Sequence, residues 1–182
     1  MKRMHRHWVL GSVIAILFVA GSVTPQGQAQ IVTIVTYLDG GQEVPPVVTG
    51  AHGKLTFTVD RGTGRATYRM DVFGLSAGVT QSHIHVGCAN VAGPTIWNIP
   101  VRAGEFPTFS LSGTLTAADF IAPRAAQGVT TLDQLIVAIM AGTTYVNVHT
   151  TTNPGGEIRG HLRVATPNDN PANRILVPCL PG

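Results

Sequence analysis

Two runs of alternating apolar and polar residues constrain the fold of this chain more than any other feature. Residues 55–59 read LTFTV, residues 65–73 read RATYRMDVF, and DRGTG lies between them. Successive side chains of a β-strand point to opposite faces, so this period of two predicts strands with one buried face. The Asp and Gly residues between the runs favour a turn, and the two runs therefore predict a β-hairpin.

Further strand-like runs recur along the chain, and one segment has a helical pattern. The additional predicted strands are residues 31–38, 79–86, 95–101, 109–115, 143–150 and 157–164. In the helical segment Thr131 and Gln134 fit a capping box, and Gly142 suits the position that ends a helix. Between these ends the apolar residues recur at helical spacing, at Leu132, Leu135, Ile136 and Ile139.

Composition agrees with these patterns, because only 12% of residues are charged and Gly, Thr and Val are plentiful. The sequence therefore predicts an all-β domain. We expect an antiparallel Greek-key or immunoglobulin-like β-sandwich or barrel with one short helix. Its predicted limits are residues 30–164, followed by a tail of residues 165–182 that is rich in Pro and Asn.

The start of the chain has the pattern of a targeting segment. Basic residues at positions 2, 3 and 6 precede an apolar run at 9–20, and Gly27 and Ala29 offer small residues for cleavage. We expect residues 1–29 to be a signal peptide that directs the protein to the periplasm or the outside of the cell. The alternative is a membrane anchor, but the apolar run is shorter than the ~20 residues of a spanning helix.

The basic excess of the chain belongs to this segment. The sequence has 12 Lys and Arg residues against 9 Asp and Glu, and without Lys2, Arg3 and Arg6 the numbers are 9 and 9. A nearly neutral protein has no basic field to attract nucleic acid or anionic lipid. We therefore expect neither nucleic acid nor, after cleavage, a membrane as a partner.

The two cysteines, Cys88 and Cys179, both follow the predicted signal peptide. Export places them in an oxidising compartment, where a Cys88–Cys179 disulfide would tie the tail to the segment after residue 85. The alternative is that Cys88 is a thiolate metal ligand, and the sequence leaves this open.

Six ordered motifs within residues 33–164 resemble the CHRD domain, which is named after chordin and also occurs in exported bacterial proteins. The resemblance implies a single β-rich domain outside the cytoplasm and indicates the fold better than the function. The motifs are LDGGQEVPPV at 38–47, GKLTF at 53–57, SHIHVG at 82–87, GTLTAAD at 113–119, YVNVHT at 145–150 and NPGGEIRG at 153–160.

Three histidines form the candidate metal site. His83 and His85 would project from one face of a strand, ~6.6 Å apart along it, and His149 lies in a second strand-like run. If the two strands are neighbours, three imidazoles converge, and such a set suits copper or zinc. A similar arrangement, alike in pattern only, occurs at the copper site of Cu,Zn superoxide dismutase. The alternative is a hydrogen-bonded polar cluster without metal. Candidates for an extra ligand are His161, Glu157 and His52.

Carboxylates in two of the motifs favour a structural role over a catalytic one. Two prolines follow Glu43 and fix an extended segment, which would present Glu43 inward to Arg159. Glu157 and Arg159 are expected on one strand face, so Glu43, Glu157 and Arg159 predict a buried charge network. No nucleophile–base pair and no phosphate-binding loop is visible in the sequence.

These observations favour an exported protein that binds one transition-metal ion, with copper ahead of zinc, for metal binding, delivery or redox chemistry. One alternative is a metal-free extracellular module that recognises a protein or a glycan. Another is a copper enzyme of the dismutase type, against which the neutral charge argues because it gives little steering of an anion. The sequence leaves enzymatic turnover and oligomeric state open.

Overall fold

The computed structural model describes residues 31–60, 62–116, 119, 121 and 129–163. The predicted signal peptide and the predicted tail, with Cys179, lie outside these residues. Eight antiparallel strands form one continuous sheet in the order β5-β4-β7-β8-β1-β2-β3-β6. The strands are β1 (Ile31–Asp39), β2 (His52–Asp60), β3 (Arg65–Phe73), β4 (Val79–Val86), β5 (Thr95–Asn98), β6 (Phe109–Leu115), β7 (Thr144–Thr150) and β8 (Ile158–Leu162).

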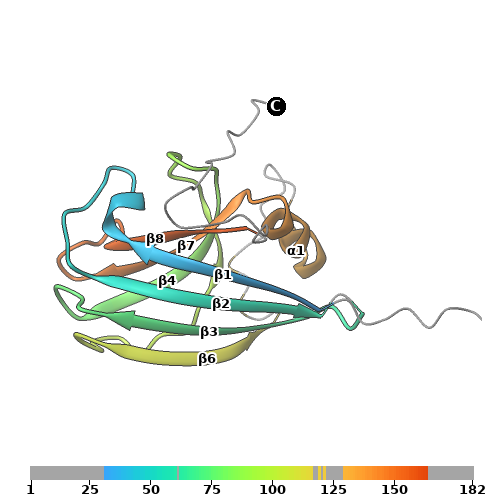
Figure 1. Cartoon of the computed structure of the whole chain (residues 1–182), viewed down its shortest axis with the longest axis horizontal. Helices are drawn as coiled ribbons and strands as arrows, with labels where there is room; N and C mark the ends of the chain where they lie inside the picture. Colours follow the sequence, from blue (N-terminus) through green and yellow to red (C-terminus); the bar gives the residue numbers. More distant parts are fainter. Residues whose placement is uncertain (1–30, 61, 117–118, 120, 122–128, 164–182) are drawn as a thin grey trace, which may run out of the picture.

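The sheet curls on itself into a half-barrel. Figure 1 shows β1, β2, β3 and β6 in front of β4, β7 and β8, with helix α1 (Leu132–Met140) beside one end of the sheet. A short 3-10 turn, η1 (Gly40–Gln42), follows β1. The predicted all-β class with one short α-helix is confirmed for the described residues. The layers belong to a single sheet, so the architecture is closer to a barrel than to two separate sheets.

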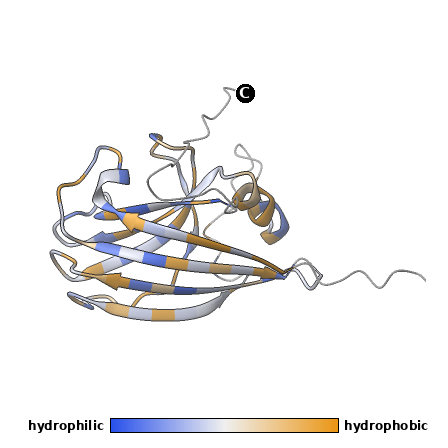
Figure 2. Ribbon diagram, in the orientation of Figure 1, coloured by the Kyte–Doolittle hydropathy of each residue, from blue (hydrophilic) through white to orange (hydrophobic). Residues whose placement is uncertain are grey.

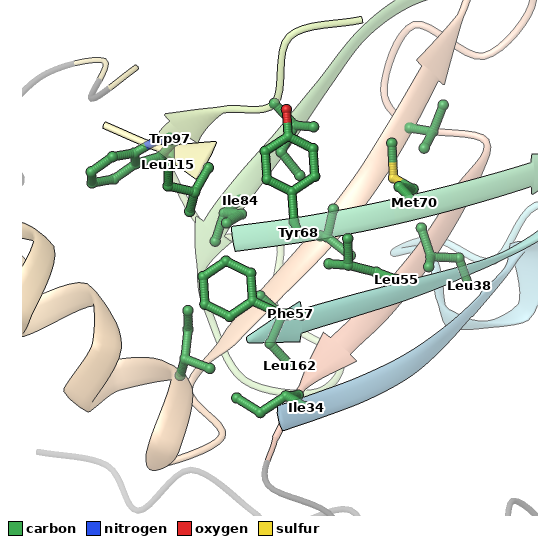
Figure 3. Close-up of a cluster of buried hydrophobic side chains, with 14 of the residues drawn as sticks. Ile34, Leu38, Leu55, Phe57, Tyr68, Met70, Ile84, Trp97, Leu115 and Leu162 are labelled. Carbon is green, nitrogen blue, oxygen red and sulfur yellow. The ribbon is translucent and has the colours of Figure 1, made fainter. Parts of the chain in front are cut away.

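The alternating runs form the hairpin and its core. Strands β2 and β3 pair in register, with Leu55 opposite Met70 and Phe57 opposite Tyr68, and all four side chains are buried. Figure 2 shows the alternation of hydrophilic and hydrophobic residues along these strands. The core fills the space inside the curl. Figure 3 shows side chains that reach it from separate strands, among them Ile34, Phe57, Tyr68, Ile84, Trp97 and Leu162.

Strand bounds differ from the predicted ones where a proline or a turn intervenes. Strand β5 ends at Asn98 although the expected run extends to residue 101. Pro100 explains this early end, because proline has no N–H to donate to a neighbouring strand. Strand β8 begins at Ile158, so Glu157 belongs to the preceding turn.

The predicted helix cap forms in a modified way. The Thr131 hydroxyl accepts a hydrogen bond from the backbone N–H of Gln134, as a capping box requires. The side chain of Gln134, however, accepts from the backbone and the hydroxyl of Thr130. Gly142 has a φ of +70°, which glycine adopts without strain, and it ends the helix as predicted.

The two histidine-bearing strands are neighbours, as the candidate metal site requires. Strand β4 pairs with β7, and His83 lies opposite Asn147. Ile84, Val146 and Val148 point into the core, so the histidines project from the outer face of the sheet. Within the described residues, no helix has the length and apolarity needed to cross a bilayer.

Replacement of Phe57 by alanine tests the assignment of the core. Phe57 is fully buried in the middle of the cluster. The substitution should lower the free energy of unfolding by about 3–5 kcal/mol, because it removes buried apolar surface and leaves a cavity. Urea denaturation measures this change. Lys54→Gln, on the exposed face of the same strand, is the control and should stay within about 0.5 kcal/mol. Equal losses in the two variants would contradict the core assignment.

Candidate metal centre

An array of polar side chains covers the outer face of β4, β7 and β8. Hydrogen-bonded strand pairing fixes their positions, because residues opposite each other on neighbouring strands share a face. Two cross-strand rows result, His83–Asn147–Arg159 and His85–Tyr145–His161. His149 lies two residues after Asn147 and thus on the same face.

The three predicted metal ligands come together within this array. One ligand atom from each of His83, His85 and His149 lies within 4.8 Å of the other two. The closest pair is His83 Nδ1 and His149 Nε2, at 3.2 Å. The side chains are only 8%, 7% and 6% exposed, respectively. The outer face is therefore covered at this point, and the imidazoles are held in a buried cluster.

A backbone carbonyl orients His85. The oxygen of Gly93 lies 2.9 Å from His85 Nδ1. A carbonyl only accepts hydrogen bonds, so Nδ1 carries the proton and Nε2 carries the lone pair. His85 Nε2 is buried and forms no hydrogen bond of good geometry, although the side chain of Asn147 interacts with the His85 ring and raises its pKa against the larger lowering by burial. This arrangement, with one nitrogen donating to a carbonyl and the other left available, is the usual one for a metal-binding histidine.

His149 is oriented in the same way from the opposite side of the cluster. Its Nδ1 lies 2.9 Å from the carbonyl oxygen of Pro154, in the turn between β7 and β8. Its Nε2 therefore carries the lone pair and faces His83. In the absence of a metal, His83 Nδ1 donates to this nitrogen, and a cation would take the place of that shared proton.

All three imidazoles are neutral at neutral pH. Burial lowers the pKa of His83 to about 4, with a further contribution from His149 and His85. Burial also lowers the pKa of His85 to about 4 and lowers the pKa of His149. Neutral imidazole is the form that binds a metal.

The spacing of the donors suits a small transition-metal ion. Ligand nitrogens lie about 2.0–2.1 Å from Zn²⁺ in a tetrahedral site, so two such nitrogens are ~3.3 Å apart. The observed 3.2 Å between His83 Nδ1 and His149 Nε2 matches that edge. The buried His85 Nε2 gives the third donor. The residues present thus fit a three-imidazole metal site.

The connection between β4 and β5, residues 87–94, covers the site and is held by two buried side chains. Arg159, which is 0% exposed, donates to the carbonyls of Cys88 and Val91, at 3.0 Å each. The Tyr145 hydroxyl lies 3.1 Å from the Gly93 nitrogen and 3.2 Å from its oxygen. These contacts fix the carbonyl that orients His85.

Tyr145 also lies between a candidate ligand and a cation. The His85 ring stacks on it at 4.6 Å, with 10° between the planes. The Arg159 Cζ lies 3.4 Å from the centroid of the same ring, as in a cation–π contact. Both groups cannot occupy one face of the ring, so they lie on opposite faces.

Glu43 is buried, and the charge of Arg159 acts on its carboxyl group, but the ion pairs found among the described residues do not include one between these two side chains. The Glu43 side chain is 6% exposed, and its Oε1 has no hydrogen-bond partner. Burial raises the pKa of Glu43 to about 7, against the lowering effect of the Arg159 charge. The carboxyl group packs against Gly156, beside the side-chain amide of Asn147.

The predicted charge network is wrong with respect to Glu157. Its carboxylate accepts hydrogen bonds from Thr49, from Thr150, and from the backbone and hydroxyl of Ser76, at 2.8–2.9 Å. The physical reason is that Glu157 precedes β8, so strand alternation does not place it beside Arg159. Both of its oxygens are engaged by these donors, so the structure does not place it among the metal ligands.

The other two candidates for an extra ligand also lie outside the cluster. His161 Nε2 is 3.1 Å from Arg159 Nη2, and because a guanidinium only donates, this nitrogen uses its lone pair there. His52 is exposed and stacks on Phe73. Cys88 is buried but is not in the donor group that His83, His85 and His149 form. The Cys88–Cys179 disulfide stays a prediction.

Three groups contribute to the geometry of the site although no sequence pattern predicts their roles. The carbonyls of Gly93 and Pro154 orient two histidines, and backbone groups leave no residue signature. A Cβ on Gly93 would collide with the carbonyl of Val86, so only glycine fits there. Tyr145 alternates with core residues of β7 in the same way as His149. This places its side chain on the outer face of the sheet but does not indicate its role.

Comparison with protein families identifies the domain to which this chain corresponds. The model of the CHRD domain matches residues 34–162. The chain belongs to the CHRD domain family. The match includes the three histidines, Glu43 and Arg159, so the histidine cluster lies wholly within the CHRD domain. Searches among curated proteins and among solved structures gave no match.

Replacement of Gly93 by alanine tests how His85 is positioned. The added Cβ forces the 87–94 segment away from Val86 and displaces the carbonyl that accepts from His85. We expect metal affinity, measured by titration, to fall by roughly 10–100-fold, as for other groups that orient a ligand. Gly50→Ala is the matched control, because a Cβ there meets open space. Unchanged affinity in both variants would argue against this positioning.

The carboxylate of Glu157 predicts a dependence of stability on pH. Burial alone would raise its pKa, but the hydrogen bonds from Thr150, Ser76 and Thr49 outweigh burial and hold the pKa below its ordinary value of 4.5. The ionised form therefore stabilises the fold above pH 4.5, and this contribution is lost as the pH falls through the lowered pKa.

Glu157→Gln should accordingly destabilise the protein by roughly 1–3 kcal/mol at pH 7, because donors are left unpaired. The difference from wild type should shrink as the pH falls below 4.5. Urea denaturation at pH 7 and pH 3 measures both values, with Glu105→Gln as the control. A difference that does not depend on pH would contradict the assignment of an ionised, hydrogen-bonded Glu157.

Proposed function

We propose that this CHRD-domain protein is exported and binds one transition-metal ion, copper or zinc, through His83, His85 and His149. The observation that carries the proposal is the orientation of the imidazoles. Two of them donate Nδ1–H to backbone carbonyls, at 2.9 Å each, and thereby direct the lone pairs of their Nε2 atoms toward the same buried cluster. A purely structural cluster would pair such buried nitrogens well, whereas His85 Nε2 forms no hydrogen bond of good geometry, although the side chain of Asn147 interacts with the ring.

Metal storage or delivery is the proposed role of the site. A bound copper or zinc ion would supply Lewis acidity or, for copper, redox activity. The chain's own residues hold the imidazoles in the neutral form and exclude water from them. Among the described residues there is one such donor group, so the bridged two-metal site of a dismutase has no counterpart there.

Export is the second part of the proposal. It is supported by the order of basic, apolar and small residues in positions 1–29. Ligands that are all imidazoles keep their metal-binding form in the oxidising conditions outside the cytoplasm, where thiolates are oxidised. The proposed location therefore agrees with the proposed chemistry.

Recognition of a glycan is a second candidate function, favoured by a different surface. A shallow hollow of about 420 Å³ lies over β2, β3 and β6, on the face turned away from the core. Several of its lining residues carry hydroxyl groups that could pair with sugar hydroxyls, and the main side chains are Thr56, Thr58, Thr67, Ser112, Thr114 and Arg69. Glycan binding there would not depend on the histidines, which separates the two candidates.

Removal of the imidazoles tests the proposed metal site. The variant His83→Ala/His85→Ala/His149→Ala should lose the tight binding of one ion per chain, as measured by elemental analysis after gel filtration. Wild-type protein at a metal concentration 100 times Kd should gain about 2.7 kcal/mol of stability, because the ion binds only the folded state. The triple variant should gain none.

His52→Ala is the matched control, because His52 is exposed and lies outside the cluster. It should bind metal as wild type does. Circular dichroism must show that the triple variant is folded. Equal metal-induced shifts in the melting temperature of wild type and the triple variant would refute the proposed function.

A further inference from the structure

The donor group supplies no negative charge to a bound ion. Among the described residues it consists of three imidazoles, without a carboxylate or a thiolate. These imidazoles are neutral in the form that binds a metal. A divalent ion would therefore bring its full charge of +2 into the cluster, and a monovalent ion a charge of +1.

Burial makes this difference in charge important. The three side chains are less than a tenth exposed. The cost of moving an ion from water into a medium of low dielectric rises with the square of its charge, so a divalent ion has a penalty about four times that of a monovalent ion of the same size. Charged groups around the cluster then determine how far this desolvation penalty is offset.

The nearest fixed cation increases the penalty. The guanidinium of Arg159 is fully buried and lies on the face of the Tyr145 ring opposite His85. One permanent positive charge thus stands a single aromatic ring away from a metal ligand. Its repulsion of a bound ion is proportional to the charge of that ion, and little solvent lies between them to screen it.

Carboxylates near the cluster do not offset the charge through coordination. Glu43 packs against Gly156 and is attracted to Arg159. The oxygens of Glu157 accept from Thr49, Ser76 and Thr150. Asp39 is Arg159's neighbour on β1, three strands away from β4, and accepts from Gln42.

We propose that the site is selective for monovalent copper, Cu(I), over Cu(II) and Zn(II). This inference rests on the proposed metal-binding function. Cu(I) has a filled d shell and is satisfied by three imidazoles, whereas Zn(II) in proteins is almost always four-coordinate and would need a further ligand inside the buried cluster. The site then selects its ion by charge, with ligands that serve copper and zinc alike.

Competition with chromogenic chelators under anaerobic conditions tests this selectivity. Cu(I), Cu(II) and Zn(II) are each titrated into the intact chain, and the three dissociation constants are compared. We expect Cu(I) to bind at least ten-fold more tightly than either divalent ion. Zn(II) or Cu(II) binding as tight as that of Cu(I) would overturn the inference but leave the proposed function intact. Failure of all three ions to bind would refute the proposed function itself.

Two single substitutions alter the charge around the site without removing a candidate ligand. Glu43→Gln keeps the shape of the side chain but removes its negative charge, and at pH 8 it should increase the preference for Cu(I) over Zn(II) several-fold. Arg159→Met removes the cation and should decrease this preference. Asp133→Asn, which removes an exposed carboxylate in the first turn of α1, outside the histidine face, is the control and should leave the preference unchanged.

If Arg159→Met does not fold, Glu43→Gln alone tests the role of charge, because glutamine has nearly the same shape as glutamate. A preference that is the same in wild type and in Glu43→Gln would overturn the role of charge. A preference that changes in the expected direction in Glu43→Gln and in any folded Arg159→Met, and stays unchanged in Asp133→Asn, supports it.

Discussion

A single buried guanidinium holds together the part of this CHRD domain that matters for its chemistry. Arg159 donates to two carbonyls of the segment between β4 and β5 and packs on the Tyr145 ring. That segment presents the Gly93 carbonyl to His85, so the tautomer and the direction of this imidazole depend on a residue that touches no ligand. The geometry of the candidate metal site therefore depends on the β4–β5 connection as well as on the strands that carry the histidines.

The inner face of the sheet forms the hydrophobic core, and the outer face carries the candidate metal site. Ile84 lies between His83 and His85 in sequence and packs in the core, whereas both histidines face outward. A shift of one residue in the pairing of β4 with β7 would bury the histidines in the core and expose the isoleucine. The hydrophobic core therefore fixes the register on which the convergence of the three imidazoles depends.

Patterns of side chains predict much of this structure, but they do not predict the contacts that backbone groups make. The alternation around residues 55–73 predicts the hairpin, and that of β4 and β7 predicts the shared face of His83, His85 and His149. Alternation misplaced Glu157, because the strand begins only at Ile158. The orienting carbonyls of Gly93 and Pro154 depend on how two connections fold back, which no residue type specifies.

The cover over the histidines also determines how fast an ion can come and go. Contacts to the imidazoles come from the β4–β5 connection and from the turn at Pro154, and the rings are almost fully buried. An ion bound to the three imidazoles would therefore enter or leave only when one of these segments opens, so its exchange would follow the rate of local unfolding rather than the strength of the metal–nitrogen bonds. The domain would then hold a bound ion with slow exchange, at a rate that the opening of its cover determines.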